Sequence, residues 1–96
     1  MANETIKVGF IGAGANTMKR HIPGLRAMQG VEFVGVANRS VESSLIAADK
    51  YELGEAYPTW LDLVEAPDID AICIGTWPYM HSTITLTALD NGKHVL

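Results

Sequence analysis

The sequence has little of what marks secreted, membrane-spanning or nucleic-acid-binding proteins. Its single cysteine, Cys73, cannot form a disulfide within the chain, which fits a reducing compartment. Seven Lys and Arg against eleven Asp and Glu give a net charge of −4, and no basic run offers a surface for phosphates. No basic and apolar leader is visible, and no apolar run approaches the roughly 20 residues that cross a bilayer. These absences predict a soluble cytoplasmic protein that binds neither nucleic acid nor membrane.

The sequence instead alternates short apolar runs with longer mixed segments. The apolar runs are rich in β-branched residues and predict strands at 6–11, 31–37, 71–74 and 94–96, with a short additional strand at 56–57. The mixed segments predict helices at 18–29, 41–53, 60–66 and 79–91. Ser40 and Thr59 are expected N-caps, and Asp62 completes a capping box with Thr59. Ile22, Leu25 and Met28 form the apolar face of the first helix, which Pro23-Gly24 interrupts, and Gly30, Gly54 and Gly92 lie just past helix ends.

This alternation of strands and helices predicts an α/β fold. Consecutive βαβ units build a Rossmann-type, doubly wound parallel sheet with three α/β/α layers, incomplete at its C-terminal side. Residues 1–96 would form one dinucleotide-binding domain. Ligands of such sheets lie at the carboxyl ends of the strands, which here are residues 12–17, 38–40 and 75–81.

The segment after the first strand has the composition of a phosphate-binding turn. Gly12 permits a tight turn, and Gly14 lets the backbone approach a pyrophosphate. Ala15, Asn16 and Thr17 lead into a helix whose free N–H groups would face the anion. Thr17 replaces the third glycine of the usual pattern, and its hydroxyl could donate to a phosphate. The alternative is a glycine-rich turn without a ligand.

The end of the second strand favours NADP(H) over NAD(H). An NAD-selective site has a carboxylate there that accepts hydrogen bonds from the ribose 2′-hydroxyl. This sequence has Asn38, Arg39 and Ser40 instead. Arg39 could pair with a 2′-phosphate or stack on adenine, while Asn38 and Ser40 could donate hydrogen bonds. The alternative is a solvated arginine beside an ordinary N-cap.

Several motifs together resemble the N-terminal domain of the Gfo/Idh/MocA oxidoreductases, named for glucose–fructose oxidoreductase and inositol dehydrogenase. They are the Gly-Ala-Gly turn at 12–14, His21, the Ala-Asn-Arg-Ser tip at 37–40, the Asp-Ala strand and following loop at 70–81, and the Ala-Leu-Asp-Asn-Gly-Lys-His-Val segment at 88–95. The last two motifs occur at the family's separation, which makes the pair more specific than the glycine turn. The resemblance covers essentially the whole chain. Thr17 and the position of His21, one residue later than in the commonest family spacing, depart from the pattern.

The resemblance implies roles for the loop after the third long strand. In such enzymes this loop lies along the pyrophosphate and the nicotinamide. Thr76 and Pro78 would contact the cofactor, His81 would fix the loop, and Trp77 would border the nicotinamide pocket. The alternatives are a capping or packing role for His81 and core packing for Trp77.

The resemblance also implies that this chain is one part of a larger enzyme. The family's catalytic Glu-Lys-Pro motif and substrate domain would follow Leu96, so no residue here is assigned as catalytic acid or base, and Lys93 and His94 are interpreted as structural. The histidines have no ligand spacing for a metal. The favoured function is the cofactor half of an NADP-dependent oxidoreductase, with NAD as the alternative cofactor, acting on a sugar, cyclitol or related polyol. A non-catalytic nucleotide-sensing module of the same family and a flavin- or other nucleotide-binding α/β protein stay open. The parent is expected to be a homo-oligomer, and this piece to self-associate through its last strand.

Overall fold

A computed structural model describes residues 5–12, 22–75 and 78–96, and its core is a five-stranded sheet. The strands are β1 (Ile6–Ile11), β2 (Val31–Ala37), β3 (Glu55–Ala56), β4 (Ala71–Ile74) and β5 (His94–Val95). The helices are α2 (Val41–Tyr51), α3 (Trp60–Glu65) and α4 (Pro78–Asp90), and residues 22–26 are also helical. Every strand pair is parallel, in the order β3-β2-β1-β4-β5. This order confirms the predicted Rossmann-type α/β fold.

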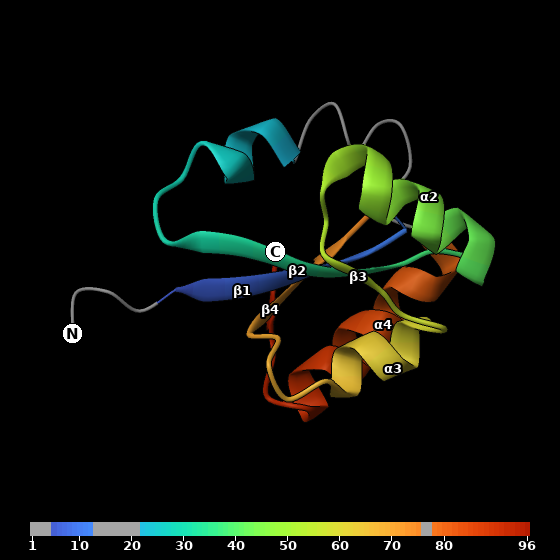
Figure 1. Cartoon of the computed structure of the whole chain (residues 1–96). Helices are drawn as coiled ribbons and strands as arrows, with labels where there is room; N and C mark the ends of the chain where they lie inside the picture. The colour runs from blue at the N-terminus through green and yellow to red at the C-terminus, as the bar shows by residue number, and fades with distance from the viewer. Residues whose placement is uncertain (1–4, 13–21, 76–77) are drawn as a thin grey trace.

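Helices cover both faces of the sheet, as Figure 1 shows. The helix at 22–26 and α2 lie on one face, and α3 and α4 lie on the other. Successive residues of a strand point to opposite faces, so β1 contributes to two separate cores. Val8 and Phe10 pack with Ala47 and Leu53 on the first face, whereas Ile11 packs with the α3 and α4 side chains on the second. The expected burial of this strand on both sides is confirmed.

Close packing of α3 on β1 depends on Gly9. A Cβ atom at Gly9 would lie 2.8 Å from Leu63 Cδ2 and 3.1 Å from Ile69 Cδ1. Leu63 is fully buried. The missing side chain therefore sets how near α3 approaches the central strand.

Ser40 and Thr59 are confirmed as N-caps, but the bond between Thr59 and Asp62 differs from that of the predicted capping box. Ser40 Oγ accepts a hydrogen bond from the Ser43 N–H at 3.0 Å at the start of α2. At the start of α3, Thr59 Oγ1 accepts from the Asp62 N–H at 3.2 Å and donates to Asp62 Oδ2 at 2.9 Å. Asp62 thus bonds the threonine hydroxyl, whereas in the predicted capping box it would accept from the backbone N–H of Thr59.

The end of α4 is also as the sequence predicts, with Gly92 just beyond the helix. Gly92 has a φ of 75°. The Gly92 N–H donates to Leu89 at 3.0 Å and the Lys93 N–H donates to Ala88 at 2.9 Å. These two bonds form a Schellman motif, in which a left-handed glycine satisfies the last carbonyls of a helix.

Several predicted boundaries are off by one to three residues, including both ends of α4, which runs from Pro78 to Asp90 rather than over 79–91. The first helix ends at residue 26 rather than 29, since the Met28 N–H bonds to Leu25 three residues back, and Met28 is 57% exposed instead of facing the core. The left-handed residue at the end of α2 is Glu52, with a φ of 55°, ahead of Gly54. Strand β3 begins at Glu55, one residue before the predicted Ala56. The predicted start of this helix at 18–21, including His21, lies outside the described residues.

Candidate dinucleotide-binding site

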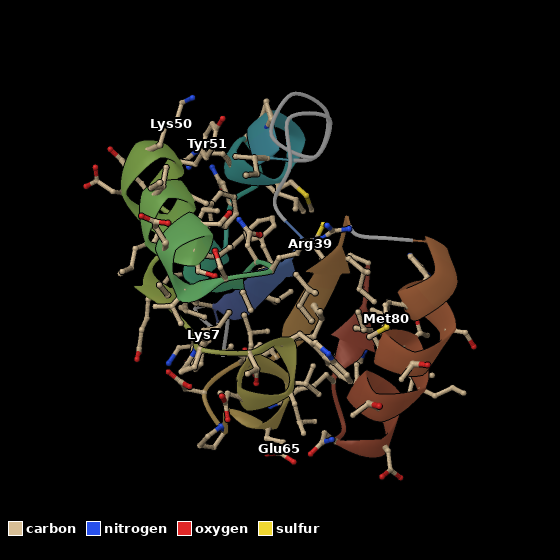
Figure 2. The ribbon with its side chains drawn as sticks, turned by 90° about the vertical axis from the view of Figure 1, so that its right-hand side faces the viewer. Lys7, Arg39, Lys50, Tyr51, Glu65 and Met80 are labelled. Atoms are coloured by element: carbon tan, nitrogen blue, oxygen red, sulfur yellow. The ribbon has the colours of Figure 1, made fainter. Side chains whose placement is uncertain are left out.

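The carboxyl ends of β1, β2 and β4 meet at one edge of the sheet. The chain leaves β1 for a helix on one face and leaves β4 for α4 on the other, so the strand order reverses between these two neighbours. Figure 2 views the molecule from this edge, with α2 and α4 on either side of the strand ends. In doubly wound sheets this reversal point is where a crevice for a nucleotide forms. We call the edge of the sheet formed by these carboxyl ends the nucleotide edge.

Gly12 makes the tight turn that was predicted for it from the sequence. Its φ of 75° lies in the left-handed region, which costs other residues energy. Its N–H donates to the Ala37 carbonyl at 3.0 Å, and the Gly75 N–H donates to the Ile11 carbonyl at 2.8 Å. The three strand ends are therefore joined by backbone hydrogen bonds. The N–H of Gly12 is therefore used within the sheet.

A network of serine and asparagine side chains orders the start of α2. Ser44 Oγ is fully buried, donates to the Ser40 carbonyl at 2.9 Å and accepts from the Asn38 N–H at 2.7 Å. The Asn38 amide nitrogen lies 3.1 Å from Ser43 Oγ. The network fixes the strand-to-helix turn and points the first N–H groups of α2 toward the nucleotide edge. The role of Ser43 and Ser44 in this turn was not predicted from the sequence, in which they are ordinary positions of the second helix.

Arg39 lies between α2 and α4 when the molecule is viewed from the strand ends (Figure 2). It is exposed, and it follows Asn38 directly after β2. No Asp or Glu occurs from Ala37 to Ser40; the nearest carboxylate along α2 is Glu42, in the first turn. This tip carries a positive side chain and a helix N-terminus, both of which favour an anion.

The other predicted site residues are only partly described. Pro78 begins α4, a position that proline favours because its ring fixes φ and the N–H is not needed. His81 is exposed within α4. Gly14, Ala15, Asn16, Thr17, Thr76 and Trp77 lie outside the described residues. The structure thus brings together Gly12, Asn38, Arg39 and Ser40, and it places α4 across the edge from them (Figure 2).

The described residues also show the state of the Cys73 thiol and of Lys93, and whether a metal site or a membrane-spanning helix is present. Burial raises the pKa of the Cys73 thiol in β4, which keeps it protonated. The Lys93 ammonium is buried and donates to the Ala66 and Ile69 carbonyls, both at 2.6 Å, as expected of a structural residue. Within residues 5–12, 22–75 and 78–96, no three His, Cys, Asp or Glu residues gather as a metal site. In the same ranges no helix has the length and apolar character to cross a membrane.

The strand order, the left-handed glycine after β1 and the capped helix after β2 define a dinucleotide-binding Rossmann domain. The model of the oxidoreductase family with an NAD-binding Rossmann fold matches residues 6–96. The chain belongs to this family, the Gfo/Idh/MocA oxidoreductases.

Relatives of known activity support the assignment. Inositol 2-dehydrogenase of Ralstonia nicotianae is 33% identical over 93 residues, which are 95% of this chain. The 1,5-anhydro-D-fructose reductase of Ensifer adhaerens is 34% identical over 88 residues, which are 92% of this chain. A 3-ketoreductase from Actinomadura kijaniata, solved with NADP and TDP-benzene, superposes with a TM-score of 0.88 at 29% identity over 97% of this chain. The chain spans only 26% to 28% of the length of these three proteins.

Proposed function

We propose that residues 1–96 are the N-terminal cofactor-binding part of an NADP(H)-dependent oxidoreductase. The whole enzyme would transfer hydride between the nicotinamide and a carbon bearing a hydroxyl or carbonyl group of a sugar, cyclitol or related polyol. The catalytic motif and a separate substrate domain would lie in the rest of the whole protein. The nicotinamide supplies the hydride chemistry, and this chain binds and orients the dinucleotide.

The observation that carries the proposal is the Asn38-Arg39-Ser40 tip beside Gly12. The pairing of Ile11 with Ala37 makes the ends of β1 and β2 immediate neighbours. One dinucleotide can therefore lie against both the glycine turn and the tip. Because the tip has no carboxylate, a 2′-phosphate would meet Arg39 and the N-terminus of α2.

The residues at this edge have separate roles in the proposal. Gly12 turns the chain, and residues 14–17 provide the N–H groups for the pyrophosphate. Arg39 pairs with the 2′-phosphate, and its exposed position over the strand ends also suits stacking on adenine. Ser40 caps α2 with its oxygen and keeps its hydroxyl hydrogen for the phosphate. Asn38 holds the turn through its amide contacts with Ser43.

Titration of the protein with NADPH and NADH by isothermal calorimetry tests the cofactor. We expect tighter binding of NADPH, and a loss of at least about tenfold in its affinity for Arg39→Ala. The control is Glu42→Gln, which removes a negative charge from the first turn of α2 and should strengthen NADPH binding. Tighter binding of NADH, or unchanged NADPH affinity in Arg39→Ala, would contradict the proposal.

The substrate class rests on the named activities of the relatives, which act on inositol, an anhydro-sugar and a 3-keto compound. The whole protein should therefore reduce NADP⁺ with a polyol or oxidise NADPH with a keto-sugar, as followed by absorbance of the reduced nicotinamide. The rival proposal is a nucleotide-sensing module. Cofactor binding without turnover on a panel of polyols and keto-sugars would favour that rival. A location in the cytoplasm stays a prediction, since it rests on the composition and the single cysteine.

We also propose that the chain pairs with a second copy along β5. In the described sheet β5 is bonded to β4 alone, and Leu86, Leu89 and Leu96 are each more than half exposed. Exposed strand edges beside apolar side chains promote association. Light scattering across a concentration series should show a dimer, and a monomer at every concentration would contradict the pairing.

A further inference from the structure

Arg26 links two helices far from the nucleotide edge. Its Nη2 donates to the carbonyl of Tyr51, the last residue of α2, at 2.6 Å. Its Nη1 lies 3.6 Å from Glu52 Oε1, and its guanidinium carbon lies 4.8 Å from the centre of the Phe33 ring in β2. Figure 2 shows Lys50 and Tyr51 at this end of α2, beside the helix at 22–26.

These contacts differ in how strongly they hold Arg26 in place. The Arg26–Glu52 ion pair is exposed on both sides, so screening by water leaves it little strength. The bond to Tyr51 is short and charge-assisted, and it satisfies one of the carbonyls that a helix leaves open at its C-terminus. The Phe33 ring beneath the guanidinium packs edge-to-face on Phe10 of β1, with centroids 4.9 Å apart. Arg26 is therefore anchored to the sheet as well as to α2.

The two helices that Arg26 joins both follow strands that end at the nucleotide edge. The helix at 22–26 comes after the glycine turn in the chain, and α2 starts at the Ser40 cap. Their far ends meet where Arg26 contacts Tyr51. Because Arg26 is also anchored on Phe33 of β2, this tie fixes the C-terminal end of α2 over the sheet, and through the stiff helix it constrains where the N-terminus of α2 at Ser40 lies.

We propose that Arg26 is a positioning residue for cofactor selection, which rests on the proposed NADP(H) function. It holds α2 at the position over the sheet from which one dinucleotide contacts Gly12 and the 38–40 tip together. NAD lacks the 2′-phosphate and depends less on the tip. Loss of Arg26 therefore weakens NADP binding more than NAD binding, although Arg26 touches neither cofactor.

The test compares Kd for NADPH and NADH in the unaltered chain, Arg26→Ala and Lys50→Ala. Lys50 is a matched control because its Nζ lies 5.3 Å from the centre of the Tyr51 ring, at the same end of α2, without bridging to the first helix. We expect Arg26→Ala to raise the Kd for NADPH by about threefold to tenfold with a smaller change for NADH. Lys50→Ala should leave the ratio of the two constants unchanged. An unchanged ratio in Arg26→Ala would overturn the proposal, even if its melting temperature falls.

A second variant, Arg26→Lys, tests the same role in case Arg26→Ala does not fold. Arg26→Lys keeps the positive charge and the stem over Phe33 but can reach only one acceptor, since a single ammonium replaces the guanidinium fork. Its ratio should lie between those of the unaltered chain and Arg26→Ala. A ratio equal to that of the unaltered chain would show that positive charge alone, and not the tie to Tyr51, is what matters.

A measurement without cofactor separates this proposal from the proposed function. The Ser43 and Ser44 amides report on the start of α2, because they bond to the Ser40 hydroxyl and carbonyl at 3.0 Å each. By hydrogen exchange, both amides should exchange faster in Arg26→Ala than in Lys50→Ala. Equal exchange would show that the C-terminal end of α2 does not control its N-terminus and would overturn the proposal. If the unaltered chain binds neither cofactor, the proposed function fails, and with it the role of Arg26 in selection, whereas exchange still reveals the mechanical link.

Discussion

The N–H of Gly12 donates to the carbonyl of Ala37 at 3.0 Å, and this bond joins the first glycine of the phosphate turn to the last residue of β2. The two motifs that the sequence presents 25 positions apart are thus one structural unit. A change in the turn should disturb the tip, and both contacts with a dinucleotide depend on the same backbone geometry.

Substitution of Gly12 tests this unit. Gly12→Ala forces a Cβ into the left-handed region at a φ of 75° and should lower the free energy of unfolding by about 1–2 kcal/mol. It should also weaken the binding of NADPH and of NADH to the same extent, because both cofactors contact the turn. Gly92→Ala is the matched control, with the same φ of 75° and nothing within 4 Å of the added Cβ. It should lose similar stability in a denaturant titration while binding both cofactors normally. Equal loss of binding in the two variants would mean that the effect is general instability.

The contact between Gly9 and Leu63 predicts a pair of compensating substitutions. Gly9→Ala places a Cβ 2.8 Å from Leu63 Cδ2, and overpacking of this kind destabilises a core by about 1–3 kcal/mol. Leu63→Val removes part of the colliding side chain. In urea titrations the double variant should be less destabilised than the sum of the single variants. Strict additivity would show that Leu63 moves aside freely and that Gly9 does not set the distance of α3.

Lys93 should stabilise the domain through its two carbonyl partners. Lys93→Met leaves the Ala66 and Ile69 carbonyls without their donor, and we expect a loss of about 1–3 kcal/mol in the free energy of unfolding. Lys50→Met changes the same residue types at an exposed position and should have little effect. A melting temperature for Lys93→Met equal to that of the unaltered chain would be incompatible with this role.

The pKa of Cys73 predicts a pH dependence of stability and reactivity. Burial raises the thiol pKa above its ordinary 9.0 in the folded chain. As pH rises through 9.0 the unfolded chain loses this proton while the folded chain keeps it, so the free energy of unfolding falls. Cys73→Ala should remove part of that fall. Iodoacetamide should alkylate the native protein at pH 8 far more slowly than the urea-unfolded chain, and equal rates would place the thiol in solvent.

Much of the fold could be predicted from the sequence, because strands and caps are encoded locally. The strand at 6–11 and the caps Ser40 and Thr59 depend on neighbouring residues, and the structure confirms them. The end of the first helix could not be predicted in the same way. Met28 has the right spacing for the apolar face, but the chain must leave the helix early to begin β2 beside β1, where the Ile6 N–H bonds to Gly30.

The location of the candidate site could be predicted from the sequence, but the residues that hold it in place could not. Parallel strands put Gly12 and the 38–40 tip at one edge, and periodicity alone indicates this. The roles of Ser44 and Arg26 depend on partners from other elements, which no local pattern reveals. The Asn38 amide was expected to face the phosphate, and its contact with Ser43 shows that it also serves the turn.

The position of β1 in the middle of the sheet has a consequence for biosynthesis. Lys7 at the start of β1 exchanges hydrogen bonds with Asp70, which lies 63 residues later in the sequence. At about 5–20 residues per second, a ribosome needs roughly 3–13 s to add that stretch. During this interval the apolar residues of the first strand are already made while the neighbour on one side does not yet exist. The nascent chain should therefore be a substrate for chaperones that hold extended apolar segments until β4 emerges.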